Sequence, residues 1–226
     1  MKKKKIFQLD SRVKEDMNYF DNIEISRDYD LNIRTSMIVP MGKVTTKVTG
    51  MCKEGDLVLD IGCATGLLAL RIGGQNEGVE ITAVDDNDNL LQVAEENAAL
   101  AAIVNSPGMV EFKYAELEEL PFPDDSFDVV YSYSALHKWD NPEKVLQEIK
   151  RVCKDGGKVY LYDIARDSDE GMISFILQYI SAGQEDFLRE LRASYTTEEV
   201  QQVLKNAGLD DWKVVADDVN LSVIKE

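Results

Sequence analysis

The chain has 226 residues, a formal net charge of −17 at pH 7 and a hydrophobic content of 44%. This length and apolar content favour one domain with a substantial core, and no apolar run is long enough to span a membrane. The charge argues against nucleic acid as a partner, because phosphate backbones bind basic surfaces. The three cysteines are widely spaced and predict neither a disulfide framework nor a zinc site. We expect a cytoplasmic protein without a metal, and the oligomeric state stays open.

The N-terminal part predicts two helices. Aromatic residues are scattered among charges from Val13 to Tyr29, and apolar residues at mixed helical spacing run from Met37 to Met51. This segment either closes over a ligand or covers a sheet edge.

The first glycine-rich stretch predicts a strand that turns sharply into a helix. The apolar run 57–59 ends in Asp60, and Gly62 and Gly66 precede the apolar helical run 67–72. Glycine has no Cβ, so the backbone turns freely and comes close to whatever lies above the strand. Open α/β sheets bind ligands at this end of their strands, beside the first helix N-terminus.

A second acid follows the next apolar run, because residues 79–84 lead directly to Asp85. A helix over about 89–103 and an alternating strand over 109–115 come next, with Glu116 at the end of that strand. Two acids at the ends of two adjacent strands suit a ligand with a cation and a ribose diol. That is the outline of S-adenosylmethionine.

The remaining pattern completes an alternating α/β order. The expected elements are a proline-containing turn (120–126), a strand (127–133), a helix from Asn141-Pro142 to Gly156-Gly157, a strand (158–163), one or two helices (171–191), a helix with a capping box (196–208) and two strands (212–216 and 221–224). The last two strands are too close for a crossover helix, so one of them runs antiparallel. We therefore predict a Rossmann-like, doubly wound, mostly parallel seven-stranded sheet with an antiparallel last strand and helices on both faces.

Four segments in this order resemble the class I S-adenosylmethionine-dependent methyltransferases, in the type 11 branch that includes the ubiquinone/menaquinone C-methyltransferases. They are the loop 60–66, Val84-Asp85, the segment 116–128, and the segments 134–139 and 148–152 with the following glycine pair. The resemblance implies an enzyme that transfers a methyl group from this cofactor to a small-molecule acceptor. Because the apolar runs recur at even spacing, we expect one domain over 1–226, with a lid or cap (1–52), a cofactor-binding core (53–165), a helical insertion (166–195) and a C-terminal helix and hairpin (196–226).

The resemblance also implies a role for each motif residue. Asp60 would orient the amino group of the cofactor's methionine part, and Asp85 would accept from both ribose hydroxyls. Glu116 would accept from the adenine amino group while the Leu117 N–H donates to the ring. Asp86 stands where the family often has an apolar residue against adenine. The predicted cofactor-binding residues are Asp60, Gly62, Cys63, Ala64, Gly66, Asp85, Asp86, Glu116, Leu117, Ser132 and Tyr29.

Two other functions stay open. A nicotinamide-dependent oxidoreductase would need glycines at positions 62, 64 and 67, where the chain has Gly62, Ala64 and Leu67. A protein that binds S-adenosylmethionine without transferring its methyl group would share the fold, because function depends on the site.

Candidate catalytic groups are few. His137, the only histidine, follows the fourth strand and is either a general base or a packing residue. Tyr131 and Tyr133 lie two residues apart on that strand, and we expect at most one of them to face the site.

Overall fold

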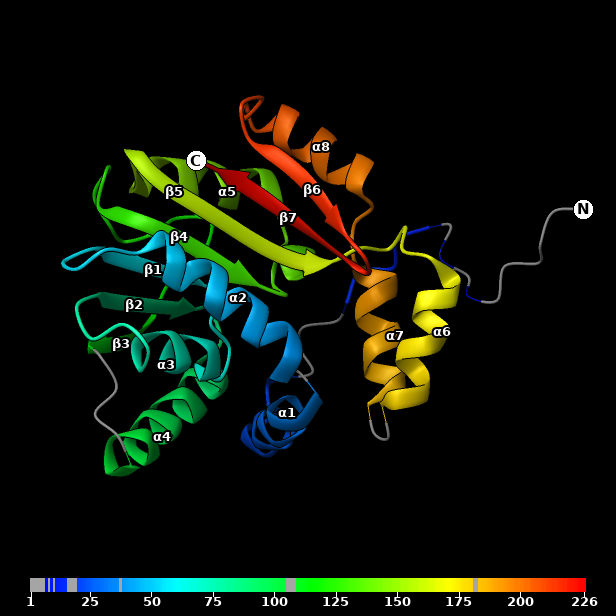
Figure 1. The fold of residues 1–226 in the computed structure, drawn as a ribbon, viewed down its shortest axis with the longest axis horizontal. Coiled ribbons are helices and arrows are strands. Elements are labelled where there is room, and N and C mark those ends of the chain that lie inside the picture. Colours follow the sequence, from blue (N-terminus) through cyan, green and yellow to red (C-terminus); the bar gives the residue numbers. More distant parts are fainter. Residues whose placement is uncertain are drawn as a thin grey trace, which may run out of the picture.

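The computed structural model describes residues 7, 9, 11–15, 20–36, 38–104, 109–180 and 183–226. At its centre lies a seven-stranded sheet of order β3-β2-β1-β4-β5-β7-β6 (Figure 1). Strands β1 to β5 are parallel, and β7 runs antiparallel to both of its neighbours, which confirms the predicted sheet. The strands are β1 (Leu57–Ile61), β2 (Glu80–Asp85), β3 (Met109–Tyr114), β4 (Phe127–Tyr133), β5 (Cys153–Ile164), β6 (Lys213–Asp217) and β7 (Asn220–Lys225).

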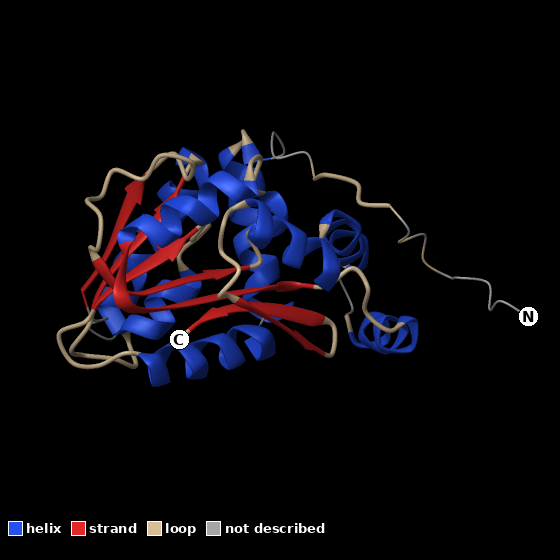
Figure 2. Ribbon diagram, turned by 90° about the horizontal axis from the view of Figure 1, so that it is seen from above, coloured by secondary structure: helices blue, strands red, loops and turns tan. Residues whose placement is uncertain are grey.

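Helices cover both faces of the sheet (Figure 2). They are α1 (Ile23–Ser36), α2 (Ile38–Met51), α3 (Leu67–Gly73), α4 (Asp88–Val104), the short 3₁₀ helix η2 (Leu136–Lys138), α5 (Pro142–Val152), α6 (Glu170–Tyr179), α7 (Gln184–Ala193) and α8 (Thr197–Asn206). Successive residues of β1 face opposite layers: Val58 packs with α2 and α3, and Leu59 packs with α5 and α8. No helix in the described ranges is long and apolar enough to cross a bilayer.

Local capping signals were predicted correctly. The Asn141 side chain accepts a hydrogen bond from the Lys144 N–H at the start of α5, and Pro142 is the first residue of that helix. Thr196 and Glu199 form the predicted capping box of α8.

Two predicted helix boundaries are wrong. Helix α1 begins at Ile23 rather than near Val13, and the described residues 11–15 are not helical. Helix α5 ends at Val152, and the glycine pair belongs to β5. A Cβ at Gly157 would lie 2.8 Å from the Cys153 Sγ and 3.0 Å from the Asp128 carbonyl oxygen, so this glycine permits a close backbone approach instead of ending a helix.

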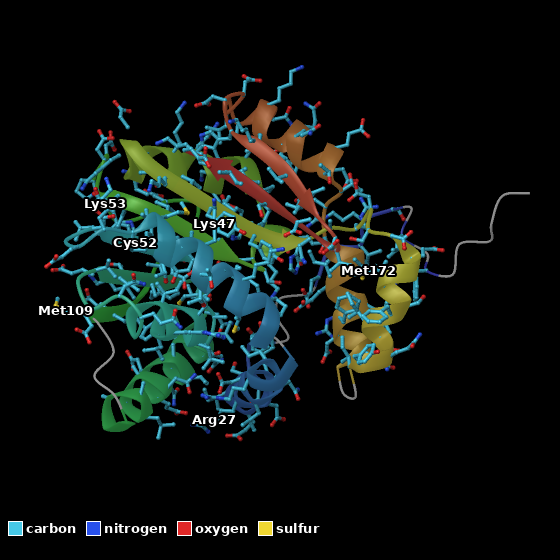
Figure 3. The ribbon with its side chains drawn as sticks, in the orientation of Figure 1. Arg27, Lys47, Cys52, Lys53, Met109 and Met172 are labelled. Carbon is cyan, nitrogen blue, oxygen red and sulfur yellow. The ribbon has the colours of Figure 1, made fainter. Side chains whose placement is uncertain are left out.

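Residues Arg12–Glu15, which we name the N-terminal strap, join α7 to η2. The Arg12 guanidinium donates to the carbonyl oxygens of Ala193 and His137 at 2.5 and 2.6 Å. The Glu15 carboxylate accepts from Arg189 of α7 at 2.9 Å. These contacts link residues far apart in sequence, so local sequence periodicity does not predict them. Helix α1 is tied separately to α4, where Arg27 (Figure 3) pairs with Glu96 at 2.7 Å.

Gly66 is required by packing. Its φ is +73°, and a Cβ there would lie 2.5 Å from the Phe112 ring and 3.0 Å from the Ala94 Cβ. We expect Gly66→Ala to lower the free energy of unfolding by about 1–3 kcal/mol through overpacking, with roughly 1 kcal/mol more from the left-handed backbone. Urea denaturation measures this loss. The control is Gly50→Ala in α2, where a Cβ meets nothing within 4 Å; an equal loss there would contradict the packing argument.

Candidate active site

A cavity of about 600 Å³ opens at the carboxyl ends of β1, β2 and β4. A smaller cavity adjoins it, and the two share Tyr29, Gly62, Ala64, Tyr133 and Ser134 in their walls. Nine of the eleven predicted cofactor residues line one cavity or both: Tyr29, Asp60, Gly62, Cys63, Ala64, Asp85, Asp86, Glu116 and Leu117. The structure therefore brings together groups that are distant in sequence at the predicted edge of the sheet.

The other two predicted residues, Gly66 and Ser132, do not line these cavities. Gly66 precedes α3 and faces Phe112 and Ala94. The Ser132 hydroxyl is buried and donates to the Ile61 carbonyl oxygen at 2.8 Å, which holds β4 against β1. Both residues support the site through the framework around it.

The loop after β1 is held in place by Asp85. One carboxylate oxygen accepts from the Ala64 N–H at 2.8 Å and the other accepts from the Asn87 N–H at 3.1 Å. Gly62 has a φ of +73°, and a Cβ there would lie 2.8 Å from the Ala135 Cβ. The loop backbone therefore forms a tight cradle against β4, and each Asp85 oxygen keeps a lone pair for a ligand.

Burial perturbs both acids of the site. It raises the pKa of Asp60 to about 8, with a smaller lowering by the nearby Tyr131 hydroxyl and a further rise from the charge of Asp85. Burial also raises the pKa of Asp85 to about 6, although the N–H groups of Ala64 and Asn87 favour its ionised form. A cation bound beside Asp60 would favour the carboxylate and lower that pKa again.

This arrangement predicts proton release when S-adenosylmethionine binds. The cofactor is cationic, so its binding should ionise Asp60, and affinity should increase as the pH rises towards 8. Calorimetry at about pH 7 in buffers of different ionisation enthalpy should show release of up to about one proton per bound cofactor. Asp60→Asn should abolish the release; a wild-type protein that binds with no proton release would contradict the prediction.

The side assigned to adenine has a wall that the sequence did not reveal. Glu116, Leu117 and Asp86 line it as predicted, and Phe20 lines it as well. Phe20 is 4% exposed, and its carbonyl oxygen accepts from the Asn89 Nδ2 at 2.9 Å, at the start of α4. The Phe20 ring packs edge to face against Tyr29 and supplies apolar surface to the same cavity. No motif marks Phe20, because long-range packing brings it to the cavity.

The end of β4 supplies the other wall. Tyr133 lines both cavities while Tyr131 is fully buried in the sheet core, so one tyrosine of the pair faces the site. Lys138 and Trp139 also line the large cavity. Sequence analysis did not single out these two residues, although their position directly after a central strand could have marked them.

Comparisons with known proteins agree with this geometry. A model of the methyltransferase domain matches residues 59–161. The chain is 31% identical over 177 residues to 27-O-demethylrifamycin SV methyltransferase of Amycolatopsis mediterranei, covering 74% of this chain and 60% of that protein. It is 30% identical over 172 residues to the ubiquinone/menaquinone biosynthesis C-methyltransferase UbiE of Marinomonas, covering 75% of this chain and 67% of that protein. The chain belongs to the S-adenosylmethionine-dependent methyltransferases.

The fold of this methyltransferase is shared with solved structures. A protein of Methanococcus maripaludis, described as an S-adenosyl-L-methionine-dependent methyltransferase, superposes with a TM-score of 0.73 at 20% identity, covering 94% of this chain and 95% of that one. In the methyltransferase loop, Leu67 packs against the core at the position where a dinucleotide fingerprint needs its third glycine.

His137 does not line the cavity of this methyltransferase. Its side chain is fully buried, with Nδ1 2.8 Å from the Asp163 Oδ1 and Nε2 3.6 Å from the Glu15 Oε2. Burial opposes its charge, but the two carboxylates raise its pKa to about 9. The imidazolium therefore links β5 to the strap, an arrangement that favours the structural role over that of a general base.

Proposed function

We propose that this protein transfers the methyl group of S-adenosylmethionine to a small-molecule acceptor. The observation that carries the proposal is the convergence of the loop backbone, Asp85 and Glu116 on one cavity of about 600 Å³. A volume within the usual range of about 300–1,000 Å³ for ligand pockets suits a nucleoside cofactor with a small acceptor beside it. The names of the rifamycin and quinone relatives describe organic compounds rather than polymers as acceptors, which supports a small-molecule acceptor.

The residues present fit the cofactor. Gly62 lines both cavities and has no room for a Cβ beside Ala135, so a ligand meets backbone at this position. Asp60 would face the methionine ammonium, Asp85 the ribose diol, and Glu116 with the Leu117 N–H the adenine. When bound, the cofactor supplies an electrophilic methyl carbon on a cationic sulfur.

The chain's own contribution would be positioning. Tyr29 and Tyr133 line both cavities, so they lie at the junction between the methionine end and the space left for an acceptor. Phe20 and Tyr29 pack edge to face, with ring centroids 5.1 Å apart, and exclude water from that junction. Holding two reactants in a near-attack geometry contributes up to about 7–11 kcal/mol to rate acceleration.

A turnover screen tests the proposal. Calorimetry should first show binding of S-adenosylmethionine and no binding of NAD. Formation of S-adenosylhomocysteine is then measured across a panel of small acceptors with carbon, oxygen, nitrogen and sulfur nucleophiles. Turnover with one class supports the proposal. Tight cofactor binding without turnover on any acceptor would favour a binding protein instead.

A further inference from the structure

Lys138 places an ammonium group in the wall of the large cavity. It is the last residue of η2, directly after β4, and its side chain is 14% exposed. The Nζ lies 5.8 Å from the ring centroid of Tyr29, which lines both cavities. The ammonium is therefore close to the end where the two cavities meet.

The described residues make no hydrogen bond to this ammonium. Within the described part of the chain, the one carboxylate within 4 Å is that of Glu190, at 3.8 Å, which is too long for a hydrogen bond. Burial disfavours the charged form, but the Tyr29 hydroxyl and the carboxylates of Glu190, Glu15 and Asp163 raise the pKa of Lys138. A nearly buried cation with free donors is costly unless a ligand satisfies it.

Trp139, in the same wall, carries a buried donor beside the loop. The residue is 5% exposed, and its indole N–H has no hydrogen-bond partner among the described residues. The Nε1 lies 3.9 Å from the position of a Cβ on Gly62, in the cradle of the loop. The Lys138 ammonium is therefore the donor that reaches the cavity, while the buried Trp139 N–H faces the Gly62 loop.

We propose that Lys138 binds an anionic oxygen of the methyl acceptor, so that the acceptor is a small organic acid bound as its anion. The inference rests on the proposed function, because it assigns the part of the cavity that the cofactor leaves free. Hydrogen bonds from a charged donor to an anion are shorter and stronger than neutral ones. Where the ionised oxygen is itself the atom that attacks the methyl carbon, no proton has to leave and no general base is needed, which agrees with the burial of His137 away from the cavity.

The opposing case is a cationic acceptor drawn in by the acids of the cavity. The acidic residues that line the same cavity are Asp21, Asp85, Asp86, Glu116, Glu118, Glu119 and Asp140. Five of them lie at or after the ends of β2 and β3, at the side assigned to ribose and adenine, while Asp140 follows η2 and pairs with Lys14. Lys138 instead follows β4, beside the tyrosines. The two cases predict opposite charge preferences for the acceptor.

Three probes that share one ring and differ in charge separate these cases. The full chain, saturated with S-adenosylhomocysteine, is titrated with benzoate, benzamide and benzylamine, and ligand-observed NMR gives each dissociation constant. Benzoate should bind at least about tenfold more tightly than benzamide, with benzylamine weakest. An equal or reversed order, or no benzoate binding up to about 10 mM, would overturn the inference.

Variants then assign the preference to one side chain. Lys138→Met should remove the tenfold preference, and Lys138→Arg, which keeps the charge, should retain it. The matched control is Lys144→Met, since Lys144 lines the same cavity but is 54% exposed and pairs with Glu118. Equal losses in Lys138→Met and Lys144→Met would overturn the assignment. Thermal melts confirm that each variant is folded.

Two further results distinguish a role of Lys138 in cofactor binding from a role in acceptor binding. If Lys138→Met weakens S-adenosylhomocysteine binding and leaves the benzoate preference intact, Lys138 holds the cofactor's carboxylate and the inference is wrong. If S-adenosylhomocysteine does not bind the wild-type protein, the proposed function fails. The affinities of benzoate, benzamide and benzylamine, measured without S-adenosylhomocysteine, then still show whether the cavity wall around Lys138 prefers anions.

Discussion

Replacing His137 with glutamine should lower the free energy of unfolding by about 3–5 kcal/mol, because the change leaves the buried Asp163 carboxylate without its cation and leaves Glu15 with Arg189 alone. Asp163 is 3% exposed and lies 2.8 Å from the imidazole, and the Glu15 side chain is 6% exposed. Denaturant titration at neutral pH measures this loss. Cofactor affinity should change little at temperatures where the variant is folded, since His137 does not line the cavity.

The pH dependence gives this prediction a sign. Because the folded-state pKa of His137 is raised from 6.5 to about 9, its stabilising contribution is fully present below about 6.5 and is lost as the pH rises through about 9. The stability difference between wild type and His137→Gln should therefore shrink above that pH.

Two outcomes decide between the roles of His137. The control is Lys14→Met, which removes the exposed pair of the strap with Asp140 and should cost about 1 kcal/mol or less. A His137→Gln variant of wild-type stability whose turnover falls by about 10²–10⁴-fold would restore the general-base hypothesis.

Replacing Asp85 with alanine should weaken S-adenosylmethionine binding by about 1–3 kcal/mol, the usual effect of leaving polar groups without a partner. The substitution removes the proposed acceptor of the ribose diol and also frees the N–H groups of Ala64 and Asn87. Calorimetry measures the affinity, and a thermal melt checks folding.

Asp86→Ala is the matched control for this experiment, because it removes the same charge one residue further along. Asp86 lines the cavity, and the structure shows no comparable pair of backbone contacts from its carboxylate to the described loop residues. Its loss of affinity should be smaller. Equal losses in the two variants would mean that the ribose acceptor has been assigned to the wrong residue.

The sheet and most of its ligand edge were predictable because they depend on local signals. Apolar runs that end in Asp60 and Asp85 mark the strand ends, and the alternation of strands with helices determines a doubly wound order. Alternation did not identify Tyr133, because residues two apart share one face of a strand; Tyr133 lines the cavity because it is the last residue of β4. These features need no knowledge of distant contacts.

The remaining features depend on long-range packing. Phe20 lines the cavity through its contact with α4, and the strap residues are arranged by groups of α7 and η2 rather than by their own periodicity. Gly66 matched a ligand-loop pattern, yet its Cα faces Phe112. A glycine pattern indicates that there is no room for a Cβ at that position. It does not show whether a ligand or the protein occupies the space.

The double duty of Asp85 has an evolutionary consequence. One carboxylate both holds the loop backbone and, as proposed, accepts from the ribose, so a single mutation there removes two properties at once. The wall formed by Phe20, Tyr29 and Lys138 comes from segments outside the loop, and each of these side chains can change without releasing the loop. New acceptor preferences should therefore arise by substitution in the N-terminal segment and η2, while the part of the cavity proposed to bind S-adenosylmethionine stays the same.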